Sequence, residues 1–97
     1  MKYRIELTDE AQDDLRWFRV YERKIILDGI KDGLSYEPLV ETRHRKELRD
    51  NPLAAWELRI QNYRVFYNAK DGDLVKIGAI GYKEHNILYV RGKEVEL

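Results

Sequence analysis

The chain has 97 residues, 43% of them hydrophobic and 37% charged, and its formal net charge is zero. This length fits one core, and the composition excludes both a disordered chain and indiscriminate binding of nucleic acid. The sequence has no cysteine, no apolar run near the roughly 20 residues of a membrane span and no signal-peptide pattern, so we expect a cytoplasmic protein without disulfides, thiolate metal sites or membrane contact.

The first half of the chain predicts one strand and two helices. Residues 2–7 alternate polar and apolar side chains, which is the period of a half-buried strand. Thr8 is suited to cap a first helix, because its hydroxyl can accept a hydrogen bond from the first turn. The apolar pattern of that helix is interrupted near Val20, and a second helix is predicted over residues 22–34, ahead of Pro38.

The segment from residue 43 to residue 49 is the most basic part of the chain. It reads Arg-His-Arg-Lys-Glu-Leu-Arg, with four lysines and arginines against one acidic residue. Such a block is either a solvated loop or helix face, or a contact for a polyanion, and both interpretations stay open. The candidate nucleic-acid-binding residues are Arg43, Arg45, Lys46 and Arg49.

The second half of the chain predicts a sheet. The helical period changes to a period of two at Trp56. Residues 63–69 form the next predicted strand, and Asp71-Gly72 is a hairpin turn pattern. Residues 74–81 are almost wholly apolar, which predicts a central strand covered on both sides. Residues 87–90 form a short last strand.

The predicted fold is therefore α+β. A small antiparallel sheet with a mixed edge would carry the N-terminal strand and a two-helix hairpin packed on one face, in the order β-α-α-β-β-β. Residues 1–97 form one domain in this interpretation. The second face of the sheet would then stay free for a ligand.

The candidate catalytic residues are cations, a histidine and a tyrosine in the second half. These are Arg59, Arg64, Lys83, His85 and Tyr89. They fall on or beside predicted strands that a compact sheet would bring together. Guanidinium and ammonium groups hold a phosphodiester, and a histidine can move protons near neutral pH. RNA cleavage without a metal or other cofactor is therefore the leading hypothesis.

Each candidate also has an ordinary structural explanation. Arg64 would fit a cross-strand pair with an acidic neighbour, which contributes only about 0.2–1 kcal/mol. Lys83 and His85 would fit a solvated loop. Tyr89 would fit the core, because Ile87 shares its face of the predicted strand. Both explanations of each residue stay open at this point.

Three runs of residues follow one another along the chain. They are a basic stretch ending in Lys46-Glu-Leu-Arg49, the strand Tyr63-Arg-Val-Phe-Tyr67, and the closing pattern Gly81-x-Lys83-x-x-x-x-x-Tyr89. In this order and at these separations, the chain resembles the RelE/ParE superfamily of type II toxin–antitoxin toxins, in its RelE-like mRNA interferase branch. The resemblance covers nearly the whole chain and implies the same β-α-α-β-β-β fold.

The resemblance implies an endoribonuclease of mRNA, associated with the ribosome, in which a 2′-OH attacks the adjacent phosphate. Arg64 matches the family's strand arginine and would clamp the phosphate in a bidentate fork. Lys83 stands where many relatives carry arginine, so it keeps the charge but loses the fork. His85 would act as general base or general acid.

Three further residues complete the site that the resemblance implies. Tyr89 would stack on a base or orient the 2′-OH. Arg59 would add a second phosphate contact. Glu57, on the same strand face as Arg59, stands where the best-known endonuclease members place a lysine, and a glutamate there would serve as general base.

The partners that the resemblance implies are a cognate antitoxin, mRNA and the ribosome, with operator DNA bound only through the antitoxin complex. Two alternatives stay open. One is a ParE-like inhibitor of DNA gyrase, which has no chemical step, and the other is a catalytically weak toxin-like domain that binds an antitoxin and with it operator DNA. Glu57 and the neutral charge favour these alternatives, whereas Lys83 and His85 favour cleavage.

Overall fold

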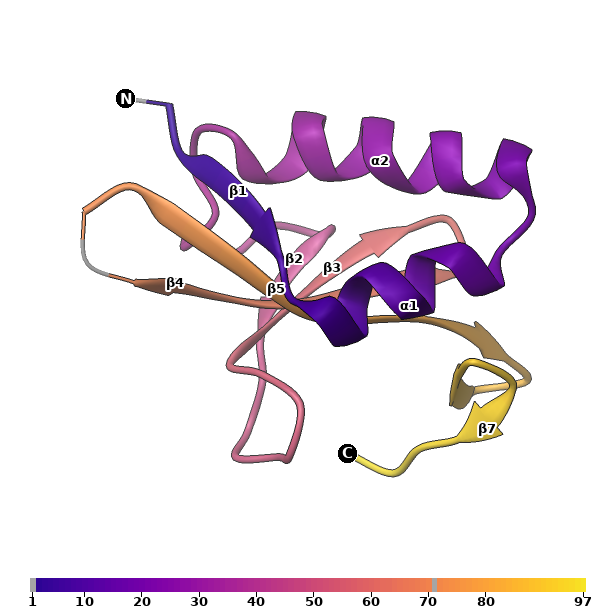
Figure 1. The fold of residues 1–97 in the computed structure, drawn as a ribbon. Helices are drawn as coiled ribbons and strands as arrows, with labels where there is room; N and C mark the ends of the chain where they lie inside the picture. The colour runs from indigo at the N-terminus through magenta and orange to yellow at the C-terminus, as the bar shows by residue number, and fades with distance from the viewer. Residues whose placement is uncertain (1, 71) are drawn as a thin grey trace.

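The computed structural model describes residues 2–70 and 72–97 and arranges them as one twisted sheet with two helices on one face (Figure 1). The elements in chain order are β1 (Arg4–Leu7), α1 (Asp9–Trp17), α2 (Val20–Leu34), β2 (Arg45–Glu47), β3 (Trp56–Ile60), β4 (Tyr63–Lys70), β5 (Leu74–Glu84), β6 (Ile87–Val90) and β7 (Lys93–Glu94). The predicted α+β class, with an N-terminal strand and two helices ahead of the main sheet, is confirmed.

Strand β5 is the centre of the sheet. The strand order is β2-β3-β4-β5-β6-β7 with antiparallel neighbours, and β1 pairs in parallel with β5 from Leu74 to Ile77. The second half of β5 pairs with β6 instead. Because β5 has hydrogen-bonded neighbours along both edges, it is covered as the apolar sequence predicts.

A side-chain hydrogen bond marks the start of each helix. The Oγ1 of Thr8 accepts a hydrogen bond from the N–H of Ala11 at 3.1 Å, as predicted for an N-cap. The chain is extended at Arg19, and the Glu22 carboxylate accepts a hydrogen bond from the Arg19 N–H at 3.1 Å. This cap starts α2 at Val20, two residues before the predicted start.

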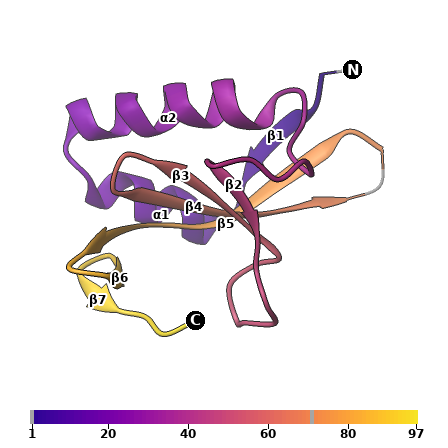
Figure 2. The ribbon, with the colours of Figure 1, turned by 180° about the vertical axis from the view of Figure 1, so that it is seen from behind.

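The larger core lies between the two helices and the sheet (Figure 2). Its strand residues alternate with residues that face the other way, as the pleat of a sheet requires. The fully buried members are Ala11, Ile26, Leu34, Val65, Tyr67, Val75, Ile77 and Ile80. The Tyr67 hydroxyl donates a hydrogen bond to the carbonyl of Pro38 at 2.5 Å, which ties the segment after α2 to this core.

The face of the sheet away from the helices carries a smaller apolar cluster. Phe66, Ala79 and Leu88 are buried there, with Leu53 and Val95 packed against them. Figures 1 and 2 show that the β2–β3 connection and the C-terminal β6–β7 hairpin both extend on this side. These two segments flank the part of the face that remains open.

Some boundaries differ from the prediction. The sequence does not predict β2 or β7, because both are short and charged and so lack an apolar alternation. The first strand begins at Arg4 and not at residue 2. The predicted Asp71-Gly72 turn includes Asp71, which lies outside the described residues. Within residues 2–70 and 72–97, no helix has both the length and the apolar character needed to cross a membrane.

Candidate functional site

Four charged residues from three neighbouring strands share the sheet face away from the helices. Glu57 and Arg59 lie on β3, Arg64 lies directly opposite Arg59 on β4, and Gly81 of β5 lies opposite Arg64. Lys83 lies two residues beyond Gly81 and therefore on the same face. We call Glu57, Arg59, Arg64 and Lys83 the charged face. The predicted sharing of one strand face by Glu57 and Arg59 is confirmed.

Glu57 is the buried member of the charged face, with 2% of its surface exposed. The Nε of Arg59 donates a hydrogen bond to Glu57 Oε2 at 3.1 Å. Lys46 lies opposite Glu57 on one neighbouring strand and Phe66 on the other. A buried carboxylate is costly without a charged or hydrogen-bonding partner, so Arg59 is its compensation and is in turn held in place by it.

The Arg64 guanidinium is fixed by the backbone of its own turn. Its Nη1 donates hydrogen bonds to the carbonyls of Gln61 and Tyr63, each at 2.9 Å. Its Nε is buried, and no described residue accepts that hydrogen. Burial lowers the pKa of Arg64, while the nearby Glu57 carboxylate opposes the shift and Arg59 adds to it. The Arg64 guanidinium still stays protonated. It is therefore a cation that two backbone carbonyls fix in place, and its Nε has no acceptor among the described residues.

Lys83 and His85 occupy the end of β5 and the turn that follows. The Lys83 N–H donates to the carbonyl of Asn62 at 2.8 Å, which fixes the strand beside the β3–β4 turn. His85 and Asn86 both have positive φ, 54° and 66°, as the central residues of a type I′ hairpin turn do. The His85 side chain is exposed at this turn, two residues beyond Lys83.

Tyr89 does not join the other candidates. It lies opposite Tyr82 in the β5–β6 pair, and the two rings are stacked with centroids 5.3 Å apart. Tyr82 stacks in turn on Trp17 of α1, so Tyr89 lies on the helix side of the sheet. The expectation that Tyr89 converges with Arg64 on one surface is therefore wrong. The two-residue turn sets the register of the β5–β6 pair. In this register Lys83 lies opposite Leu88, and Tyr89, the residue after Leu88, faces the other side of the sheet.

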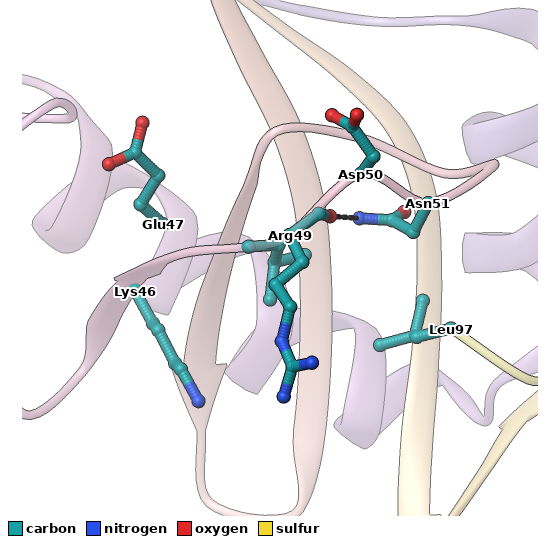
Figure 3. A pocket seen from close by; sticks show the side chains of 7 residues that line it. Lys46, Glu47, Arg49, Asp50, Asn51 and Leu97 are labelled. Carbon is teal, nitrogen blue, oxygen red and sulfur yellow. Dashed lines mark hydrogen bonds between the residues drawn. The ribbon is translucent and has the colours of Figure 1, made fainter.

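The basic segment divides between the two faces. Arg45 donates to the carbonyl of Gly33 at 2.8 Å and to that of Val40 at 2.9 Å, so its guanidinium joins β2 to the end of α2. It is not the free cation that the sequence suggests. The side chains of Lys46 and Arg49 are exposed and extend in the same direction (Figure 3).

The open cations of the basic segment line a hollow of about 430 Å³. Its other lining residues are Glu47, Leu48, Asp50, Asn51 and Leu97. Figure 3 shows Asp50 directed away from the tips of Lys46 and Arg49. Arg43 is exposed outside this lining. Lys46 and Arg49 therefore remain available for a polyanion at this hollow, whereas Arg45 is committed to the fold.

One buried ionisable residue is missed by the sequence analysis. Asp14 of α1 is 2% exposed and accepts a hydrogen bond from the N–H of Ile80 at 3.0 Å. The signal is its spacing, because Asp14 falls three residues after Ala11 and four before Phe18, on the apolar stripe of the helix. An acidic residue on such a stripe indicates a specific buried partner.

The arrangement favours the binding of an anion. Arg59, Arg64 and Lys83 present three cations on one face. In the part of the chain that the structure describes, no group of three or more histidine and carboxylate side chains is placed to hold a metal ion. The cations on the charged face can stabilise negative charge on a bound group.

Comparisons with known proteins agree with the fold. Among solved structures, the chain is similar to a chain of the toxin–antitoxin complex RelBE2 from Mycobacterium tuberculosis, with a TM-score of 0.71 and 26% sequence identity. The match covers 86% of this chain and 100% of that chain. No curated protein matches the chain. Residues 5–87 match the family described as the ParE toxin of type II toxin–antitoxin system, parDE. The chain therefore belongs to this toxin family, within the RelE/ParE superfamily.

Proposed function

We propose that this toxin is a metal-independent endoribonuclease that cleaves mRNA in the cytoplasm, on the ribosome, by attack of a 2′-OH on the adjacent phosphate. The observation that carries the proposal is the Arg64 guanidinium, which two backbone carbonyls hold through Nη1 on the same sheet face as Arg59 and Lys83. A phosphate oxygen is a strong acceptor for such a donor. A site preorganised in this way stabilises the charge that develops in the phosphorane.

Each residue of the charged face has a role in this proposal. Arg64 and Arg59 bind the non-bridging oxygens of the phosphate, and Lys83 adds a third positive charge. Glu57 orients Arg59 through the 3.1 Å hydrogen bond. His85, exposed at the adjacent turn, transfers a proton to or from the reacting oxygens. Tyr89 has no role here, because it stacks on the other side of the sheet.

The proposed partners follow from the family. The similar structure from Mycobacterium tuberculosis is a toxin–antitoxin complex, and we propose that this chain also binds an antitoxin, through which it reaches operator DNA. An acidic antitoxin segment would neutralise Lys46 and Arg49, which line the hollow beside β2. The same two cations would contact RNA phosphates in the absence of the antitoxin.

Induction of the chain alone in bacteria tests the proposed reaction. Growth should stop, and primer extension should map new ends in mRNA. Arg64→Ala should lower the cleavage rate by about 10²–10³-fold, which is typical for the loss of one transition-state charge donor. His85→Ala should lower it by about 10²–10⁴-fold if proton transfer limits the rate. Arg4→Ala is the matched control, because Arg4 pairs with Asp73 at the far end of the sheet.

Inhibition of DNA gyrase is the second candidate function, and the match to the ParE family favours it. Supercoiling of plasmid DNA by gyrase separates the two candidates. Arrested growth with intact transcripts and relaxed plasmid DNA would establish gyrase inhibition in place of RNA cleavage. Full toxicity of both Arg64→Ala and His85→Ala would likewise contradict the ribonuclease.

A further inference from the structure

Asp14 connects three parts of the molecule through one buried carboxylate. Its Oδ2 accepts the hydrogen bond from Ile80 of β5 at 3.0 Å. Its Oδ1 lies 2.9 Å from the Nε of Arg91, an ion-pair distance, although the two groups are not aligned as a hydrogen bond. The carboxylate is buried, whereas the Arg91 side chain is about half exposed. A buried carboxylate with such specific partners fixes them relative to one another.

The partners of Asp14 lie beside the charged face. Ile80 follows the β-bulge of β5, where the pairing of Phe66 and Tyr67 shifts by one residue. Ile80 also precedes Gly81, which lies opposite Arg64. The hydrogen bond from Ile80 therefore holds β5 immediately next to the position of the phosphate-binding arginine. On the edge of β5 that faces away from β4, β1 pairs only as far as Ile77 and β6 only from Tyr82, so the N–H of Ile80 has no strand partner there and Asp14 accepts its hydrogen bond.

Arg91 lies in the turn that closes the β6–β7 hairpin. Arg91 and Gly92 have φ of 50° and 76°, so this is another turn with left-handed backbone. The turn rests on α1, because a Cβ added at Gly92 would lie 3.4 Å from the Trp17 ring. A Cβ at Gly81 would lie 2.3 Å from the Tyr89 carbonyl oxygen, so only glycine allows β6 to approach β5 this closely.

We propose that Asp14 is a positioning residue, which anchors the β5–β6–β7 segment on α1 and thereby holds Lys83 and His85 in register with Arg64. Lys83 and His85 both lie between Ile80 and Arg91, the two partners of the carboxylate. The consequence for catalysis rests on the proposed RNA cleavage. The anchoring of the hairpin does not depend on it.

Asp14→Asn separates this role from general stability. The amide oxygen still accepts the hydrogen bond from Ile80, so the fold is retained, but the attraction to Arg91 is lost. We expect amide hydrogen exchange in residues 85–92 to rise at least about tenfold, with β1 and β3 unchanged. Arg91→Met should give the same pattern, and Arg91→Lys should restore part of the protection.

The rate of RNA cleavage by each purified variant is measured together with its hydrogen exchange. Asp14→Asn should lower kcat with little change in KM, because substrate still binds but Lys83 and His85 are held less firmly. Asp13→Asn is the matched control, since Asp13 is an exposed neighbour that pairs with Arg16. It should change neither measurement.

Three outcomes would overturn the inference. Unchanged exchange in residues 85–92 would show that Asp14 does not anchor the hairpin. Faster exchange spread equally over β1 and β3 would show a loss of global stability only. Faster exchange of the hairpin with unchanged kcat would remove the positioning role. A wild type that cleaves no RNA, with the hairpin still released by Asp14→Asn, would instead reject the proposed function and leave the anchor standing.

Discussion

The two faces of the sheet are built from the same strands, but they differ in polarity and in how far other segments cover them. Strand β4 contributes Val65 and Tyr67 to the helix-covered core and Arg64 to the charged face. The core face is apolar and closed, whereas the charged face is flanked by the β2–β3 connection and the C-terminal hairpin. Because neighbouring residues of one strand serve different faces, single substitutions can change stability and activity separately.

The largest expected effect on stability lies on the core face. Ile77 is fully buried in β5, and Ile77→Ala should lower the free energy of unfolding by about 2–5 kcal/mol through lost burial and a residual cavity. Lys76 is the exposed neighbour of Ile77, so Lys76→Ala should change the free energy of unfolding by no more than about 0.5 kcal/mol. Urea denaturation of both variants measures the difference. Equal losses of unfolding free energy in Ile77→Ala and Lys76→Ala would contradict the assignment of stability to the core face.

Arg45 and Arg49 sharpen the comparison within one basic segment. Arg45→Ala removes two hydrogen bonds to backbone carbonyls and should lower the free energy of unfolding by about 1–3 kcal/mol. Arg49→Ala should leave stability within about 0.5 kcal/mol and instead weaken RNA binding, with a smaller salt dependence. Thermal unfolding and binding at several salt concentrations test the pair. If Arg45→Ala kept its stability but bound RNA more weakly, Arg45 would be an RNA-binding residue and not a structural one.

Glu57 offers a case in which stability and activity should move apart. Glu57 is the buried partner of its ion pair, whereas the Arg59 side chain is 40% exposed, so loss of the carboxylate leaves a cation that water can solvate and no uncompensated buried charge. Glu57→Met should therefore keep the free energy of unfolding within about 1 kcal/mol, while Arg59 loses its partner and RNA cleavage falls. Denaturation and cleavage assays on the same preparation check this. A large loss of stability would mean that the carboxylate belongs to the fold rather than to the site.

The smallest expected effect is a pH dependence that comes from α1. Burial raises the pKa of Asp14, against the opposing effects of Ile80 and Arg91, and Asp13 and Glu10 add to the increase. The folded protein therefore binds this proton more tightly than the unfolded chain does. The resulting stabilisation is complete below the ordinary aspartate pKa of about 3.9 and is lost as pH rises through the folded-state value.

Asp14→Asn removes this titration. The difference in unfolding free energy between Asp14→Asn and wild type should therefore change as pH rises from the ordinary aspartate pKa of about 3.9 through the raised folded-state pKa, and become constant at higher pH. Urea denaturation across this range measures it, and Asp28→Asn, at an exposed position of α2, serves as the control. Parallel stability curves for wild type and Asp14→Asn would contradict the raised pKa.

The sequence predicts those parts of the fold that have strong periodicity. Strands β4 and β5 are found because their apolar patterns are long and clear, and Thr8 marks the start of α1. The three charged residues of β2 form a strand only because β3 offers them an edge. Such tertiary pairing leaves no local pattern in the sequence.

The candidate site was predictable only in part. Arg59, Arg64 and Lys83 share a face, as counting along their strands suggests. The position of Tyr89 depends on the turn at His85 and Asn86, which has none of the glycine typical of such turns. Had that two-residue turn been recognised, its register would have placed Tyr89 opposite Tyr82 and away from Lys83.

The parallel pairing of β1 with β5 constrains how the protein is made. Arg4–Leu7 pairs with Leu74–Ile77, so β1 leaves the ribosome well before the strand that it pairs with. Contacts this distant in sequence slow folding, because a long loop must close before they form. The charged face also needs β5 in place. We therefore expect the charged face to form only after β5 has left the ribosome, so the strands made before it remain without this surface during translation.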